Sequence, residues 1–368
     1  MQKLEPKTAL GLYSDASAVY INACILKTDG VDVFDEPISL TRPYSAELRE
    51  RILAFKYPDD LTNVALLKDL NEKITAEHVA VAKELLAQTA RQIPHIDIVG
   101  YSGHLLHHRP EEKLNIYLGD GDKLAQELQI PVVDQFAQAD MKAGGTGGGV
   151  LMTFMEAITR HQEKPLAIVS LSGITRLNYI GSLGERMAFD VGVGCLLIDR
   201  WLQKHAGLEM DFDGTWAEKG KVDTRLLAYL MKTPYLSQKP PKTLDRDDFN
   251  VLLAHVEGST VEDGVATLTE FVVQNIVNAV RFLPEKPKQW IVMGGGTLNP
   301  AIMLRLKRSL SEPVETISRL EMPAYNLDAA GYGFLAVRFL MQMPITFPET
   351  TGVSTPMTGG VYHSSVKA

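Results

Sequence analysis

The stretch Val132-Val133-Asp134-Gln135-Phe136-Ala137-Gln138-Ala139-Asp140-Met141-Lys142-Ala143-Gly144-Gly145 is the most informative part of the chain. It starts within a short apolar run, residues 131–133, which predicts a buried strand. A polar segment follows, and the glycines of residues 144–149 predict a loose connection. Gln135 stands close after the strand, and its amide is not basic near neutral pH. A water molecule beside Gln135 would therefore find no base in that side chain.

Working outward, short apolar runs and longer helical patterns alternate along the chain. Strands are predicted at residues 8–12, 18–25, 96–101, 114–118, 131–133, 166–171 and 290–293. Helices are predicted at residues 60–92, 123–128, 150–162, 195–208, 260–282 and 300–311. This order favours an α/β architecture. A length of 368 residues favours two domains, which would offer a cleft between them.

The composition is that of a globular protein with a small-molecule or protein partner. Hydrophobic residues make up 45% of the chain and charged residues 22%, enough for a sizeable core. The net charge of −8 disfavours binding to nucleic acid or to anionic membranes. The two cysteines lack CxxC spacing, so neither a disulfide framework nor a zinc site is indicated. No signal peptide or spanning apolar run is recognised, and we expect a cytoplasmic protein.

Several glycine-containing turns lie between the predicted elements. They are Gly11-Leu12-Tyr13-Ser14-Asp15-Ala16-Ser17, Ser170-Leu171-Ser172-Gly173-Ile174-Thr175-Arg176, Phe189-Asp190-Val191-Gly192-Val193-Gly194-Cys195 and Met293-Gly294-Gly295-Gly296-Thr297-Leu298-Asn299-Pro300. Glycine lets backbone amides approach an anion or a flat ring closely. Together with the stretch around Gln135, these segments resemble anhydro-N-acetylmuramic acid kinases over nearly the whole chain, from Gly11 to Gly360.

The resemblance implies a two-lobed, actin-like or hexokinase-type (ribonuclease H-like) ATPase fold with an interlobe cleft. It implies lobes formed by residues 1–140 with 337–368 and by residues 141–336. Members of the family use ATP with Mg²⁺. They open the 1,6-anhydro ring of the amino sugar with water and phosphorylate its 6-hydroxyl group, in peptidoglycan recycling. No metal site of another kind is expected.

The first phosphate-binding turn is altered relative to the family. The resemblance assigns Ser14, Asp15, Ser17 and Asn22 to nucleotide binding. Asp15 would place a carboxylate where phosphate is expected, which is unfavourable between like charges, and Asn22 stands where the family has an acid. An ordinary β-hairpin with Ser and Asp at its turn is an equally simple interpretation.

The other nucleotide positions are better preserved. The resemblance assigns Gly173, Thr175, Asp190, Gly192, Gly194, Gly294, Gly295, Gly296 and Asn299 to nucleotide binding. The triple glycine is the best-preserved motif, because a tight turn alone needs one or two glycines rather than three.

For the sugar, the resemblance assigns His104, His108, Asp120, Arg176 and Asp328. Arg176 could pair with an anion bidentately, although a surface ion pair is the simpler interpretation. The spacing of His104, His107 and His108 suggests a metal site at first sight, but His104 is expected on a turn and a fourth ligand is missing.

The family's catalytic base is an Asp at the position of Gln135. Our first hypothesis is therefore a family member with impaired phosphotransfer that binds a sugar, a nucleotide or a catalytically active paralogue, as a homodimer or heterodimer. The second hypothesis is an active sugar kinase whose base is Asp134 or Asp140, or whose substrate has changed. Alternation along a strand turns Asp134 away from Gln135. A regulatory binding protein of the actin-like group is a third hypothesis.

Overall fold

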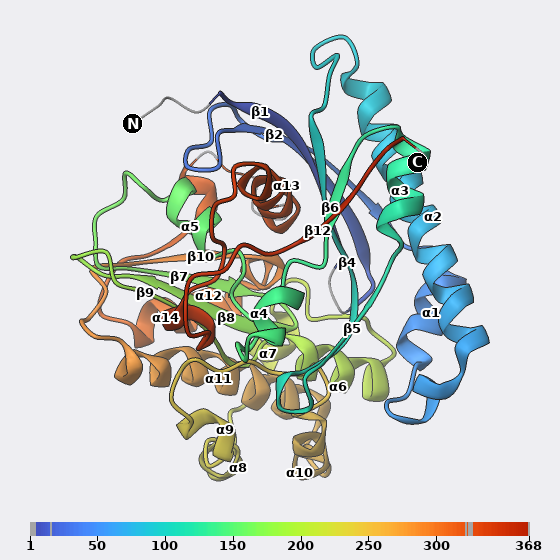
Figure 1. Ribbon diagram of the computed structural model, residues 1–368. Coiled ribbons are helices and arrows are strands. Elements are labelled where there is room, and N and C mark those ends of the chain that lie inside the picture. The colour runs from blue at the N-terminus through green and yellow to red at the C-terminus, as the bar shows by residue number, and fades with distance from the viewer. Residues whose placement is uncertain (1–4, 15–16, 321, 323–326, 367–368) are drawn as a thin grey trace. The chain divides into compact units, whose positions relative to one another are not determined.

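The structure is a computed structural model that describes residues 5–14, 17–320, 322 and 327–366 (Figure 1). The chain forms two compact units. The first is Met1–Arg160 with Glu321–Ala368, and the second is His161–Leu320. The division expected from the sequence lay at residues 140/141 and 336/337. The second bound differs because the helix α13 (Leu327–Leu340) packs on strands of the first unit, and the first bound differs because residues 152–158 pack on α13.

The first unit contains a seven-stranded mixed sheet. Its strands are β1 (Lys7–Ser14), β2 (Tyr20–Thr28), β3 (Ile38–Pro43), β4 (Ile98–Arg109), β5 (Leu114–Leu118), β6 (Val132–Asp134) and β12 (Val361–His363). Its helices are α1 (Ala46–Ala54), α2 (Val64–Thr89), α3 (Gly121–Leu128), α4 (Gln138–Lys142), α5 (Met152–Ile158), α13 and α14 (Pro348–Thr351), with short 3₁₀ turns η1 (Asp59–Thr62) and η2 (Pro110–Glu112).

Helix α13 lies close against this sheet because two strand residues lack side chains. A Cβ atom on Gly11 of β1 would come 1.7 Å from the carbonyl oxygen of Ala329, and one on Gly100 of β4 would come 1.9 Å from that of Tyr332. Leu10 and Leu12 alternate with these positions and enter a separate hydrophobic core with α1 and α2. The sheet is therefore covered on both faces, as Figure 1 shows for α13 and α2.

The second unit contains a five-stranded sheet formed by β7 (Leu166–Leu171), β8 (Ile174–Ile180), β9 (Arg186–Val193), β10 (Gln289–Met293) and β11 (Val314–Thr316). Its helices are α6 (Leu196–Ala206), α7 (Thr215–Lys219), α8 (Thr224–Leu230), α9 (Pro234–Ser237), α10 (Leu253–Val256), α11 (Val261–Ala279) and α12 (Pro300–Ser309). Short 3₁₀ turns are η3 (Asn250–Leu252), η4 (Val280–Phe282), η5 (Gly295–Leu298) and η6 (Ile317–Leu320).

The two sheets share one strand order. In the first unit it is β3-β2-β1-β4-β6, and in the second it is β9-β8-β7-β10-β11. In both, the first three strands along the chain are antiparallel neighbours and the last two join in parallel. The predicted α/β class is confirmed, and the repeated order is that of a doubled ribonuclease H-like lobe.

One local expectation was wrong. His104 does not lie on a turn, because β4 continues from Ile98 to Arg109 and carries His104, His107 and His108. A register irregularity between Leu105 and His107 interrupts the pairing of β4 with β5. None of the helices within the described ranges has both the length and the apolar character that crossing a bilayer requires.

Candidate active site

The segment that follows β6 is the centre of the candidate site. Gln135 comes directly after the strand, is half-buried, and has a φ of 52°, which places a non-glycine residue in the left-handed region. Its Oε1 atom accepts a hydrogen bond from Nε2 of Gln138 at 2.7 Å. The next residue, Phe136, is buried and its ring lies 5.6 Å from that of Tyr332 on α13. A neutral amide thus stands at the position that the resemblance assigns to the base.

The carboxylate before Gln135 is already paired. Asp134 is the last residue of β6 and is buried, and its Oδ1 atom lies 2.9 Å from Nε2 of His363. Nδ1 of the same imidazole lies 2.7 Å from Oδ1 of Asp122. The hydrogen bond with Asp134, and then the one with Asp122, raise the pKa of His363 to about 9. The imidazole is therefore charged at neutral pH and neutralises part of the charge of Asp134.

Asp140 is also held inside the protein. It lies on α4 with a side chain that is 1% exposed. Its Oδ1 atom accepts from the backbone N–H of Gly147 at 2.8 Å, and its Oδ2 atom accepts from the hydroxyl group of Thr351 at 2.6 Å. Both carboxylate oxygens therefore fasten neighbouring backbone and side-chain groups. Asp140 therefore acts as a structural anchor for the glycine-rich segment of residues 144–149.

The described part of the first turn is closed by side chains from neighbouring elements. Ser14 ends β1 and is buried, and its hydroxyl oxygen accepts from the hydroxyl group of Tyr44 at 2.8 Å. Ser14 Oγ also lies 3.1 Å from Nδ1 of His104. Asp15 falls outside the described residues, and Ser17 lies in the half-buried turn before β2. Asn22 on β2 accepts from the hydroxyl group of Thr41 at 2.8 Å.

The remaining predicted sugar positions of the first unit lie on three different elements, β4, α3 and α13. His108 contacts Asn115 across the β4–β5 pair, with Nδ1 and Oδ1 2.9 Å apart. Asp120 begins α3 as its N-cap and accepts from the backbone N–H of Lys123 at 2.9 Å. Asp328 is half-buried in the first turn of α13. A role for these residues in sugar binding stays a prediction.

In the second unit, three glycine-containing turns come together at one end of the sheet. The turn between β7 and β8 and the turn after β9 are joined by backbone hydrogen bonds, from Gly194 to Gly173 at 2.8 Å and from Cys195 to Ser172 at 2.8 Å. The turn after β10 reaches the same place, because a Cβ atom on Gly296 would come 2.4 Å from Leu171 and 3.1 Å from the sulfur of Cys195. The sequence motifs therefore converge within this unit.

The glycines of these turns differ in why the fold needs them. Gly294 has a φ of +92°, and a Cβ atom there would come 2.5 Å from the carbonyl oxygen of Leu171. Gly194 is likewise too close to Ser172 to bear a side chain. Around Gly295, in contrast, nothing lies within 4 Å of an added Cβ atom, and Gly173 would make only an ordinary contact. Packing explains Gly294 and Gly194, whereas Gly173 and Gly295 leave open main chain that a ligand can approach.

Asp190 on β9 joins three segments of the second unit. Its Oδ1 atom accepts from Nε of Arg176 at 2.8 Å, and its Oδ2 atom accepts from the hydroxyl group of Thr243 at 2.7 Å and from the backbone N–H of Leu244 at 2.9 Å. Arg176, expected at the sugar, thus pairs with a residue expected at the nucleotide. The ion pair makes Asp190 a structural junction.

The other nucleotide positions also have local roles. Asn299 is the N-cap of α12 and donates from Nδ2 to the carbonyl oxygen of Asp211 at 2.9 Å. Thr175 is fully buried, and its hydroxyl oxygen would lie 2.9 Å from a Cβ atom on Gly194. Gly192 lies against Asn275 of α11, whose Nδ2 atom would come 2.7 Å from an added Cβ atom.

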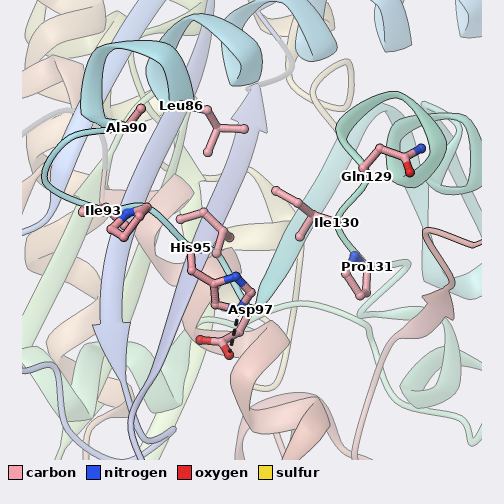
Figure 2. A pocket seen from close by; sticks show the side chains of 10 residues that line it. Leu86, Ala90, Ile93, His95, Asp97, Gln129, Ile130 and Pro131 are labelled. Carbon is pink, nitrogen blue, oxygen red and sulfur yellow. Dashed lines mark ion pairs between the residues drawn. The ribbon is translucent and has the colours of Figure 1, made fainter.

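A cavity of about 500 Å³ lies in the first unit, apart from all of these positions. Figure 2 shows its apolar walls, with Leu86 and Ile93 on one side and Ile130 and Pro131 on the other. His95 and Asp97 form an ion pair at its rim, with Nε2 and Oδ1 3.6 Å apart. The cavity lies where β4 and β6 begin, whereas ligands of α/β proteins bind where parallel strands end.

Comparison with known proteins decides the family. The family model described as anhydro-N-acetylmuramic acid kinase matches residues 7–364. The chain belongs to the anhydro-N-acetylmuramic acid kinase family. The anhydro-N-acetylmuramic acid kinase of Rhodospirillum rubrum is 38% identical over 356 residues, which cover 96% of this chain and 93% of that relative. The one of Paramagnetospirillum magneticum is 36% identical over 356 residues, covering 96% and 99%.

Among solved structures, the chain is similar to the activator of the 2-hydroxyisocaproyl-CoA dehydratase from Clostridium difficile with bound ADPNP. The TM-score is 0.44 at 12% identity, covering 91% of this chain and 96% of that one. Such a distant similarity does not carry a ligand from that protein to this member of the kinase family.

Sequence patterns gave no signal for three residues that contact the candidate site. His363 and Thr351 hold Asp134 and Asp140, and Tyr44 holds Ser14. His363 lies 229 positions from Asp134 in the sequence, and Thr351 lies 211 positions from Asp140. Contacts at such separations leave no local sequence pattern.

Proposed function

We propose that this member of the anhydro-N-acetylmuramic acid kinase family binds the family's sugar and a nucleotide but transfers phosphate poorly or not at all. The observation that carries the proposal is Gln135. In the family reaction, water attacks the anhydro ring and must lose a proton to a base. A carboxylate can accept that proton, whereas an amide cannot. A general base contributes roughly 10²- to 10⁴-fold to a rate, so we expect a loss of that order.

The neighbouring carboxylates support this proposal, because each is engaged elsewhere. Asp134 pairs with His363, and Asp140 accepts hydrogen bonds on both oxygens. Both residues are also buried, at 5% and 1% exposed, so a water molecule has little access to either carboxylate. A relocated base at Asp134 or Asp140 is therefore the less favoured alternative.

An amide at residue 135 is compatible with sugar binding. Gln135 retains an oxygen that accepts and a nitrogen that donates hydrogen bonds. Replacing a carboxylate by an amide keeps much of its hydrogen-bonding shape while removing its basicity. We therefore infer that the protein can hold the intact anhydro sugar without opening it.

For the nucleotide, the open main chain at Gly173 and Gly295 fits a ligand that approaches the backbone closely. The positions assigned by resemblance fit Mg²⁺ less well. Asn22 is neutral, and both oxygens of Asp190 accept hydrogen bonds from the protein. Hard cations prefer several oxygen ligands with carboxylates among them. We therefore expect ATP to bind with a weak dependence on Mg²⁺.

Calorimetry with the purified protein tests the proposal. Separate titrations with ATP and with 1,6-anhydro-N-acetylmuramic acid are followed by a turnover assay with both ligands. Sugar binding without turnover supports the proposal. Turnover as fast as that of an active relative contradicts it, and loss of that turnover in Asp134→Asn or Asp140→Asn would then identify a relocated base.

A matched pair of variants refines this test. Gln135→Asp restores a carboxylate at the position of the base, and Gln138→Asp places one a turn away on the same segment. A gain of turnover in the first variant alone would place the missing base at residue 135.

The biological role that we propose is that of a sugar-binding protein of peptidoglycan recycling, as a homodimer or paired with an active paralogue. Size-exclusion chromatography with light scattering, with and without the sugar, tests the first arrangement. Two copies per particle support a homodimer, and a single copy leaves the heterodimer as the expected assembly.

A further inference from the structure

The C-terminal segment of the chain, residues 346–363, runs along the segment that carries Gln135. Both segments belong to the first unit. The contacts come on both sides of Gln135, although the contacting residues are more than 200 positions apart in sequence. We call residues 346–363 the C-terminal strap.

Backbone contacts join the C-terminal part of the strap to the residues around Gln135. β12 pairs antiparallel with β6, with Val361 opposite Asp134. A Cβ atom on Gly359 would come 2.1 Å from the carbonyl oxygen of Phe136, so the two main chains are in direct contact. Gly359 can make this approach only because it has no side chain. The strap thereby contacts the residues directly before and after Gln135.

Side chains fasten the strap at both ends. At one end, the hydroxyl group of Thr351 donates to Asp140 at 2.6 Å, and the backbone N–H of Thr146 donates to the carbonyl oxygen of Thr351 at 2.8 Å. At the other end, His363 bridges Asp134 and Asp122. The side chains of His363 and Asp134 are 11% and 7% exposed, so this ion pair is largely shielded from water.

The charges around His363 strengthen its hydrogen bonds to Asp134 and Asp122, which attach the end of the strap to β6 and α3. The carboxylates that face its ring are Asp134 from β6 and Asp122 from α3, and they raise the pKa of His363 to about 9. Charge-assisted hydrogen bonds on both ring nitrogens need the doubly protonated imidazolium. Removing the ring would leave Asp134 buried without its cation, which is costly.

We propose that the C-terminal strap holds residues 134–147 in the conformation that presents Gln135, with His363 as the positioning residue that closes it. The left-handed backbone of Gln135 is a conformation that the strap would stabilise. Such a conformation persists when its surroundings over-determine it. The consequence for sugar binding rests on the proposed function, whereas the restraint of the segment does not.

Hydrogen exchange of the full chain, measured by mass spectrometry at pH 7, tests the strap without any ligand. The reporters are the amides of Thr146 and Gly147, which donate to Thr351 and Asp140. In His363→Phe, which keeps a ring of similar volume, we expect exchange of residues 134–147 to rise about tenfold or more. The control is His95→Phe, which removes a different His–Asp pair of the same unit and should leave these peptides unchanged.

Unchanged exchange of residues 134–147 in a folded His363→Phe variant would overturn the strap. If that variant does not fold, Asp122→Asn removes only the more exposed of the two carboxylates, and a smaller rise in the same peptides is expected. No rise in Asp122→Asn would then overturn the proposal.

Calorimetry with the sugar separates the two proposals. Increased exchange together with weakened sugar binding in His363→Phe supports both. If exchange increases in His363→Phe but the wild-type protein binds no sugar, the strap is supported and the proposed function is contradicted.

Discussion

Gln135 combines a neutral side chain with a left-handed backbone. Its φ of 52° is unusual for a residue with a Cβ atom and costs roughly 1–2 kcal/mol. Strain of this kind is found at functional segments that their surroundings hold in place. Here Asp134 and Phe136 are buried on either side. The residue whose side chain lacks basicity is thus also one whose left-handed backbone lies between two buried neighbours.

Replacing Gln135 by glycine tests the strain. We expect Gln135→Gly to raise the free energy of unfolding by about 0.5–1 kcal/mol, because glycine adopts positive φ without a steric cost and loses part of this gain to its greater freedom in the unfolded chain. Urea denaturation measures the change. The control Gln138→Gly, within α4, should lower the free energy of unfolding. A lower value for Gln135→Gly would show that the backbone is not strained.

His363 predicts a pH dependence of stability. Its pKa rises from an ordinary value of 6.5 to about 9 on folding, so the folded state binds the proton more tightly than the unfolded state. The stabilisation is fully present below pH 6.5 and is lost as pH rises through about 9. Denaturation series between these pH values should show a decline in wild type that is absent in His363→Phe. Identical slopes for the two proteins would contradict the ion pair.

At the scale of elements, the candidate nucleotide site is a meeting of three turns in the second unit. Gly294 is required by the fold, because its φ is positive and Leu171 lies too close for a side chain. Gly295 is not, since nothing lies within 4 Å of an added Cβ atom. Adjacent glycines in one turn therefore serve different purposes.

The variants Gly294→Ala and Gly295→Ala separate these purposes. We expect Gly294→Ala to lower the free energy of unfolding by roughly 1–3 kcal/mol or more, through backbone strain. Gly295→Ala should change stability by less than about 1 kcal/mol and weaken ATP binding, because its methyl group enters the open main-chain surface. Thermal denaturation and calorimetry check the pair. Full ATP affinity in Gly295→Ala would remove this turn from the nucleotide site.

Sequence patterns predicted elements better than they predicted contacts. The apolar runs located β1, β7 and β10 because a strand buried on both faces needs a nearly continuous apolar stretch. The polar strand β4 was recognised only in its first part, and His104 was expected on a turn. The pairing of His363 with Asp134 joins residues that lie 229 positions apart, and a lone histidine near a chain end gives no local signal of it.

At the scale of the whole molecule, the chain forms two units whose sheets follow the same strand order. The sequence shows no internal repeat that would predict two similar units. Two units can share a fold because they share a pattern of buried positions, without sharing residue identities. The family match over residues 7–364 assigns both units to one kinase family. Asn22 and Gln135, the positions at which the resemblance predicts that an acid has been lost, both lie in the first unit.

The most direct test of the central claim is a search for phosphorylated sugar at stoichiometric protein concentration. The protein is incubated with ATP, Mg²⁺ and 1,6-anhydro-N-acetylmuramic acid, and the sugar is analysed by mass spectrometry over a time course. We predict that the anhydro sugar is recovered intact, bound to the protein, under conditions in which an active relative converts it. Formation of the 6-phosphate at the relative's rate would contradict the claim and show that another group takes the proton from water.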